Sequence, residues 1–180
     1  MRAAAFLFCV AALGALPSPC LAAEGDSIAP RLGFALGGLY GQARNEPRVE
    51  AYTLDPILQV ELGVKFDRHL GVYALGEAGT IIFAAQAAAY AVVEWTPFPV
   101  LALGTGIGGD AMAGGGGGSC ESTCPDGGFA GFSIPLIVGI DVARLPRGAL
   151  RLDLEAAGGF DHRTSTYGWH TAFTFGWVMD

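Results

Sequence analysis

The chain has 180 residues, of which 52% are hydrophobic and only 15% are charged, and 28 are glycines. Because a soluble domain carries about 25% charged residues, this composition excludes an ordinary water-facing surface. The formal net charge is −7 and no basic stripe can be drawn, which excludes nucleic acid as a partner. No apolar run of about 18 or more residues lies outside the N-terminus, which excludes a helical membrane span in the mature chain.

The N-terminal segment has the pattern of an export signal. Arg2 supplies a positive charge, a short apolar run follows it, and small residues end at Ala23. We therefore predict a cleaved signal peptide over residues 1–23 and a single domain over residues 24–180.

The cysteines fall into two groups. Cys20 lies at the end of the predicted signal, and the alternative of a lipidated Cys20 is disfavoured by Pro19 directly before it. Cleavage leaves Cys120 and Cys124 as an isolated pair in an exported protein, and an oxidising compartment favours a local disulfide between them. Two cysteines without a histidine at ligand spacing do not make a structural zinc site, so no metal and no cofactor is predicted.

The rest of the chain is a series of alternating apolar and polar segments, and the clearest one covers residues 57–67. Its residues alternate in side-chain character with a period of two, which is the pattern of a β-strand. The apolar set is Leu58, Val60, Leu62, Val64 and Phe66, and the polar set is Gln59, Glu61, Gly63, Lys65 and Asp67. This pattern is typical of a barrel strand that is apolar outside and polar inside.

Similar segments predict about eight strands in all. In chain order they cover residues 31–42, 57–67, 70–80, 86–95, 100–109, 129–142, 150–155 and 169–177. Small residues leave the facing of the third strand open. Longer loops are expected at residues 43–55, 110–128 and 158–167, where glycine, proline and polar residues gather.

Alternating long and short connections indicate an all-β fold, a closed antiparallel up-and-down transmembrane β-barrel of about eight strands. A sheet in lipid cannot leave an edge unpaired, so the first strand is expected to pair with the last. An interior of this size is only wide enough for side chains to fill, so a filled polar interior is predicted and an open pore is not. The residues expected in this barrel-interior polar network are Glu61, Lys65, Glu94, Asp141, Arg151, Asp153, Glu155 and His170.

Aromatic residues cluster near the predicted strand ends and indicate two interfacial girdles. On the short-turn side we expect Phe66, Trp95, Phe98 and Trp177, and nearer the loops Tyr40, Tyr52, Tyr90 and Trp169.

In these repeats and in its aromatic last strand, Trp169 to Trp177, the chain resembles the small outer-membrane β-barrel proteins of Gram-negative bacteria, the OmpA/OmpX-like type. The resemblance implies a location in the outer membrane, with its lipids and the barrel-assembly machinery as partners. Such proteins usually end in an aromatic residue, whereas here Val178, Met179 and Asp180 follow Trp177. The resemblance is one of architecture, which leaves the external partner open.

Two enzymatic interpretations are disfavoured. Gly104, Gly106 and Gly109 form a GxGxxG pattern, but a dinucleotide site needs a helix after it and a run of glycines follows instead. A hydrolase built on His170 and Ser133 can be imagined, but the lipid A deacylase barrels carry a serine two residues after the histidine, where this chain has Ala172. No catalytic residue is therefore predicted.

The sequence thus favours a non-enzymatic integral outer-membrane barrel with surface loops for envelope structure or external interaction. A small channel or transporter for small solutes is the alternative. A soluble lipocalin-like carrier of an apolar ligand ranks third, because its facing would be inverted and the glycine- and alanine-rich face would cover a soluble barrel poorly.

Overall fold

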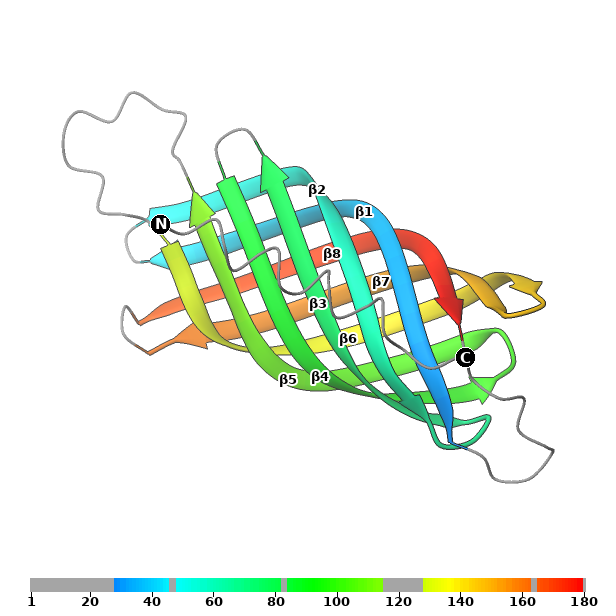
Figure 1. Cartoon of the computed structure of the whole chain (residues 1–180). Helices are drawn as coiled ribbons and strands as arrows, with labels where there is room; N and C mark the ends of the chain where they lie inside the picture. The colour runs from blue at the N-terminus through cyan, green and yellow to red at the C-terminus, as the bar shows by residue number, and fades with distance from the viewer. Residues whose placement is uncertain (1–27, 46–47, 82–83, 115–127, 163–164, 180) are drawn as a thin grey trace, which may run out of the picture.

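The structure is a computed structural model that describes residues 28–45, 48–81, 84–114, 128–162 and 165–179. Within them the chain forms eight strands arranged as a tilted barrel (Figure 1). The strands are β1 (Ala29–Asn45), β2 (Arg48–Lys65), β3 (Leu70–Ile81), β4 (Ala84–Phe98), β5 (Leu101–Gly114), β6 (Gly128–Leu145), β7 (Gly148–Asp161) and β8 (Thr166–Met179). The predicted signal peptide and the cysteine pair lie outside the described residues.

Each strand is antiparallel to its neighbours in the chain, and β1 also pairs with β8, which closes the barrel. This closing seam runs from Leu32 opposite Met179 to Arg44 opposite Tyr167, and Figure 1 shows the blue β1 beside the red β8. Closure leaves no strand edge with unpaired backbone groups, as lipid requires. The prediction of a closed antiparallel eight-stranded barrel is confirmed. No helix long and apolar enough to cross a membrane occurs in the described ranges.

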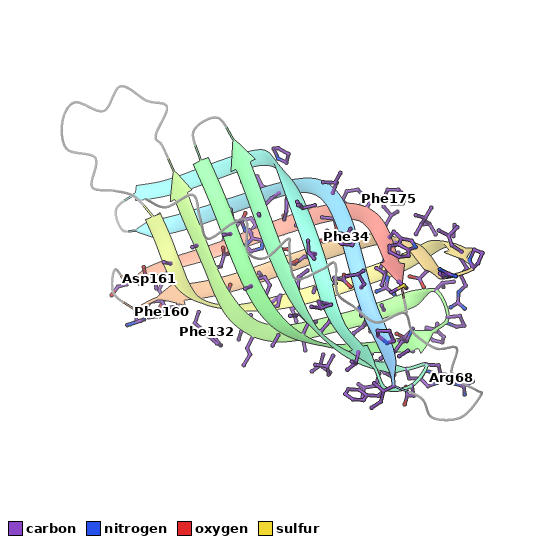
Figure 2. The ribbon with its side chains drawn as sticks, viewed as in Figure 1. Phe34, Arg68, Phe132, Phe160, Asp161 and Phe175 are labelled. Atoms are coloured by element: carbon purple, nitrogen blue, oxygen red, sulfur yellow. The ribbon has the colours of Figure 1, made fainter. Side chains whose placement is uncertain are left out.

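The two faces of the wall separate as predicted. On β2, Leu58 and Leu62 are 45% and 50% exposed, whereas Gln59 and Glu61 between them are buried in the interior. The other strands follow the same rule, and Figure 2 shows large side chains such as those of Phe34, Phe132 and Phe175 around the outer face. Most of the large apolar side chains therefore face outward and most of the charged strand residues face inward, which is the reverse of a lipocalin-like carrier.

The strands extend further at the loop end than predicted. The expected loop at residues 43–55 is wrong, because β1 continues to Asn45 and β2 starts at Arg48. Residues 110–114 and 158–161 are likewise strand, and of the predicted glycine-rich loop residues 115–127 lie outside the described part. Backbone pairing to the adjacent strand outweighs the weak strand preference of glycine, alanine and polar residues here.

The opposite end of the barrel carries the short turns at residues 66–69, 99–100 and 146–147, together with the start of β1 and the end of β8. In the first turn the Asp67 carboxylate accepts hydrogen bonds from the backbone N–H groups of His69, at 2.5 Å, and Leu70, at 2.8 Å. Directly after the third turn, Gly148 has a φ of 132°, a backbone conformation that would be strained for a residue with a side chain.

The GxGxxG segment lies within β5 and continues as strand into Gly114, so the helix needed for a dinucleotide site is absent from this segment. Its even-numbered glycines face inward where the wall is tight. A Cβ added at Gly108 would lie 2.7 Å from Tyr90 Cα on the neighbouring strand, so these glycines allow close approach of β5 to β4.

Candidate functional site

The candidate site is the barrel interior, which holds charged side chains in two groups. We call Arg31, Glu61, Glu94, Asp141 and Arg151 the ion-pair cluster, which lies toward the short-turn end. We call Glu77, Asp110, Glu155 and His170 the histidine cluster, which lies nearer the loop end. These side chains reach the interior because they occupy inward positions of the two-residue period on their strands.

Arg31 joins three strands of the ion-pair cluster. Its two terminal nitrogens bind the two carboxylate oxygens of Glu94 at 2.6 and 2.8 Å, and its Nε donates to Glu61 at 2.8 Å. The guanidinium also lies 4.2 Å from the centre of the Tyr73 ring. Arg31 is fully buried, so each charge in this part of the cluster is compensated by a direct contact.

Arg151 extends the cluster across the barrel. It donates to Glu94 at 2.9 Å and to Asp141 at 2.8 Å. Glu94 of β4 thereby receives hydrogen bonds from Arg31 of β1 and Arg151 of β7, and none of these three strands is a neighbour of another. The side chains must therefore meet across the lumen at this level.

The histidine cluster is more deeply enclosed, and three acids surround one imidazole. His170 is fully buried, with Nδ1 2.9 Å from Asp110 Oδ2 and Nε2 3.5 Å from Glu155 Oε1 and 3.6 Å from Glu77 Oε2. The Nδ1 contact is short, but the ring N–H is not directed along it, so it is an ionic contact without hydrogen-bond geometry. The two Nε2 distances are too long for hydrogen bonds.

Gln59 positions both glutamates of the histidine cluster. Its amide nitrogen donates to Glu77 Oε1 and, at 3.0 Å, to Glu155 Oε2, and its amide oxygen accepts a 2.7 Å hydrogen bond from Thr174. One oxygen of each glutamate is thus occupied by Gln59. The other two, Glu77 Oε2 and Glu155 Oε1, have no hydrogen-bond partner among the described residues, and neither has His170 Nε2.

An apolar patch separates the polar groups along one side of the lumen. It consists of Tyr73, Leu75, Ala88, Tyr90, Val92, Ile137 and Ala157. The placement of Tyr90 in an interfacial girdle is therefore wrong, since its ring is 3% exposed and points inward from β4. Tyr90 and Glu94 are four residues apart on β4, so the two-residue period of the strand places both side chains on the inner face. The period therefore predicts an inward Tyr90, although an aromatic residue near a strand end suggests a girdle.

The eight residues predicted for the interior network differ in their contacts. Glu61, Glu94, Asp141 and Arg151 meet in the ion-pair cluster, whereas Glu155 and His170 meet in the histidine cluster. Asp153 is buried, and both Asp153 and Arg151 lie close to Gly139: a Cβ added at Gly139 would be 2.5 Å from Asp153 Oδ1 and 3.0 Å from Arg151 Cδ. Lys65 is half-buried at the end of β2.

Three further charged residues of the interior were not predicted from the sequence: Arg31, Glu77 and Asp110. Arg31 stands two residues before Gly33 and so has inward parity, but it was taken only as the start of a strand. Glu77 lies in the third strand, where the many small residues left it open which face points inward. Glu77 is four residues from Tyr73, so the two side chains share the inner face of that strand. Asp110 had been placed in a loop, which is wrong because β5 continues through it.

The described aromatic residues of the two predicted girdles, apart from Tyr90, lie on the outer face. Tyr40 and Trp169 are on the neighbouring strands β1 and β8 toward the loop end, with ring centres 5.6 Å apart. Trp95 is 54% exposed and Phe66 40% exposed near the short turns, and Trp177 is half-buried. Phe98 is also exposed there, and the side chain of Tyr52 lies outside the described set.

Among the described residues, Ser133 and His170 do not form the hydrogen-bonded pair that a hydrolase would need. His170 and Ser133 are both fully buried, and Ser133 Oγ has no hydrogen-bond partner among the described residues. Ala172, at the position where the deacylase barrels carry serine, is also buried. The nucleophile and base of an acyl-transfer site therefore do not meet here.

A closed eight-stranded antiparallel barrel with a charged interior and an apolar exterior is the architecture of the small outer-membrane barrels. Among solved structures, Neisserial surface protein A (NspA) matches with a TM-score of 0.59 and 12% identity, over 85% of this chain and 98% of that one. Ail, the attachment invasion locus protein of Yersinia pestis, matches with a TM-score of 0.50 and 9% identity, over 83% of this chain and 98% of that one. No family model and no curated protein matches the sequence. At these identities the likeness shows the fold.

Proposed function

We propose that this chain is a non-enzymatic integral outer-membrane β-barrel protein with a side-chain-filled interior, whose loop end meets the exterior of the cell. The observation that carries the proposal is the inverted distribution of side chains. Leucine, isoleucine and phenylalanine side chains on the outside are commonly half exposed or more, as at Leu36 (67%) and Leu136 (59%), while arginine and glutamate are buried inside. Such a surface is costly in water and favourable in a hydrocarbon layer.

The strand lengths support a wall that extends beyond the membrane. β2 has 18 residues and β1 has 17. At about 3.3 Å per residue and a tilt of about 40°, 18 residues rise roughly 45 Å, whereas the apolar band of a barrel is only about 25 Å tall. The loop-end part of β1 and β2 contains polar residues such as Arg44 and Glu50. We take this extension and the connections above it as the surface for an external partner.

The names of the two similar structures agree with a role at the cell surface, because one is called a surface protein and the other an attachment invasion locus protein. The filled interior argues for structure or attachment over transport. Ion pairs between strands that are not neighbours cross the lumen at the level of Glu94, so an open pore of the porin kind does not fit.

The first test is the fractionation of cells that express the full chain, followed by electrophoresis of unheated and boiled samples of the outer-membrane fraction. A closed lipid-facing barrel resists cold SDS, so we expect a shift in apparent mass that boiling abolishes. Recovery in the soluble periplasmic fraction without a shift would contradict the membrane assignment. Planar-bilayer recordings then distinguish a filled barrel from a small channel. Steady conductance would contradict the filled barrel and favour the channel.

A further inference from the structure

The histidine cluster contains buried polar atoms that no hydrogen bond among the described residues satisfies. Three buried side chains from three different strands, Glu77, Glu155 and His170, each place one potential ligand atom within 4.8 Å of the others. The three side chains are 0%, 1% and 0% exposed. Glu77 Oε2, Glu155 Oε1 and His170 Nε2 each lack a hydrogen-bond partner among the described residues, so three unmatched polar atoms lie close together in the interior. Leaving them unmatched is costly in the interior of a protein.

The two distances from His170 Nε2 to the glutamate oxygens are compatible with a coordination shell. His170 Nε2 lies 3.5 Å from Glu155 Oε1 and 3.6 Å from Glu77 Oε2. In a tetrahedral site with metal–ligand bonds of about 2.0 to 2.2 Å, neighbouring ligand atoms are roughly 3.3 to 3.6 Å apart. One imidazole nitrogen with two carboxylate oxygens is also a donor set that zinc and similar transition metals accept.

The surroundings hold these ligands in place as the second shell of a metal site does. A metal-bound histidine commonly has a carboxylate beside its other ring nitrogen, and the Asp110 carboxylate lies in ionic contact with His170 Nδ1, with Oδ2 2.9 Å away. Gln59 binds the remaining oxygen of each glutamate, which aims Glu77 Oε2 and Glu155 Oε1 toward the imidazole. Thr174 in turn fixes the Gln59 amide.

The charge balance points to a dication. Glu77 and Glu155, together with Asp110, place three carboxyl groups around one imidazole, and no arginine or lysine is paired with Glu77 or Glu155 among the described contacts. The arginines of the interior are engaged elsewhere, with Glu61, Glu94 and Asp141. A divalent ion would neutralise the pair and satisfy all three unmatched atoms at once.

We propose that Glu77, Glu155 and His170 bind one divalent transition-metal ion of the zinc type inside the barrel, with Asp110 and Gln59 positioning the ligands. The ion would tie β3, β7 and β8 together across the lumen, above the ion-pair cluster. This site is independent of the proposed outer-membrane function, because it uses only the interior of the closed barrel.

The test is metal binding by the full chain, refolded in detergent micelles and stripped with a chelator. Cys120→Ser and Cys124→Ser form the background, so that thiols do not compete for the ion. We expect one Zn²⁺ per barrel by elemental analysis after gel filtration, and visible absorption typical of low-coordinate Co²⁺ when cobalt replaces zinc. A His170→Asn variant should lose binding by at least a hundredfold, and the exposed-histidine control His162→Asn should bind as the parent does.

A second variant keeps the test decisive if His170→Asn does not fold. Gln59→Met retains all three ligands and removes only their orientation, so we expect a tenfold to hundredfold loss of Zn²⁺ affinity in titration calorimetry. Failure of the parent to retain Zn²⁺, or equal affinity in Gln59→Met and the parent, would overturn the site. The cluster would then be an imidazolium held by its three acids. Neither result bears on the cold-SDS shift, which tests the membrane assignment separately.

Discussion

Arg31 is the residue on which the ion-pair cluster depends, because it neutralises the two buried glutamates Glu61 and Glu94. Replacing Arg31 with methionine keeps the length of the side chain but removes its hydrogen bond to Glu61 and both of its hydrogen bonds to Glu94, which keeps the one from Arg151. Breaking a buried ion pair on one side costs about 3 to 5 kcal/mol. We expect Arg31→Met to lower the free energy of unfolding by this amount, measured by urea titration in micelles with tryptophan fluorescence.

The matched control for this prediction is Arg147→Met, which removes an arginine that is exposed in the turn before β7 and should change stability little. Adding Glu94→Gln to Arg31→Met should cost less than the sum of the two single changes, because the second change removes part of the uncompensated charge. Additive costs in this cycle would show that the two side chains do not interact in the folded barrel.

Asp67 gives a prediction on pH, since it lies in a water-exposed turn. The backbone N–H groups of His69 and Leu70 stabilise its carboxylate and hold its pKa below the ordinary value. A carboxyl group with a lowered folded-state pKa adds stability above its unfolded-state pKa, which is about 3.9, and this contribution disappears as pH falls through the lower folded-state value.

We therefore expect Asp67→Ala to be less stable than the parent at pH 6, and we expect this difference to shrink as pH falls through the lowered folded-state pKa, in urea titrations across this range. Asp67→Asn keeps an acceptor oxygen and removes the charge, so it should lie between the two. A difference between parent and Asp67→Ala that persists unchanged to the lowest pH would show that the capping charge is not its source.

At the same scale, the sequence predicted the facing of most interior charges but not their partners. Parity along a strand places Glu94 and Arg151 inside, since each lies between outward apolar residues. Which strands meet across the lumen depends on closure and tilt, which a local pattern does not contain. The contact between Gln59 of β2 and Glu155 of β7 is an example, because it joins residues far apart in the sequence.

At the scale of elements, the periodicity located all eight strands but not their loop-side ends. The signal is strong where large apolar residues alternate with polar ones, as in β6 and β8. It fades where the outward positions are alanine or glycine, as in the loop-end half of β4, and the strand there is held by its register with β3 and β5. Strand lengths were therefore underestimated wherever pairing, not side-chain pattern, maintains the strand.

The closing seam between β1 and β8 makes a prediction about packing. A Cβ at Gly37 would lie 2.7 Å from Thr174 Cα on β8, a distance that backbone atoms cannot tolerate without moving. We expect Gly37→Ala to destabilise the barrel by about 1 to 3 kcal/mol through overpacking. The measurement is the fraction of refolded protein that migrates as the compact form in cold SDS.

Gly158→Ala is the matched control for the seam, because a Cβ there meets no atom within 4 Å and the residue is also in a strand. It should fold as well as the parent or slightly better, since alanine loses less conformational freedom on folding. Equal folding yields for both alanine variants would contradict the close approach of β1 and β8.

At the scale of the whole molecule, the two faces of the wall have exchanged the roles they have in a soluble protein. The interior is held by ion pairs and hydrogen bonds that cross the lumen, and the exterior is a continuous apolar surface. The alternation of apolar and polar residues in the sequence assigns each residue to one of two faces, but it does not show which face lies inside the barrel. The size of the residues decides this, because a narrow lumen of eight strands accommodates mainly glycine, alanine, polar side chains and a few large apolar ones such as Leu75, whereas most leucines and phenylalanines lie outside.

This inversion predicts opposite responses to a charge on the outer face in a membrane barrel and in a soluble one. Leu136 is 59% exposed near the middle of β6, and Val142 is 51% exposed near the short-turn end of the same strand. In a bilayer, Leu136→Arg should cost about 2 to 4 kcal/mol and Val142→Arg about 0 to 1 kcal/mol, because the cost of arginine falls with distance from the midplane. Unfolding of the two variants in lipid vesicles by denaturant titration measures both values. If instead Leu136→Arg leaves stability unchanged or raises it, then the outer face is in water and the membrane assignment is wrong.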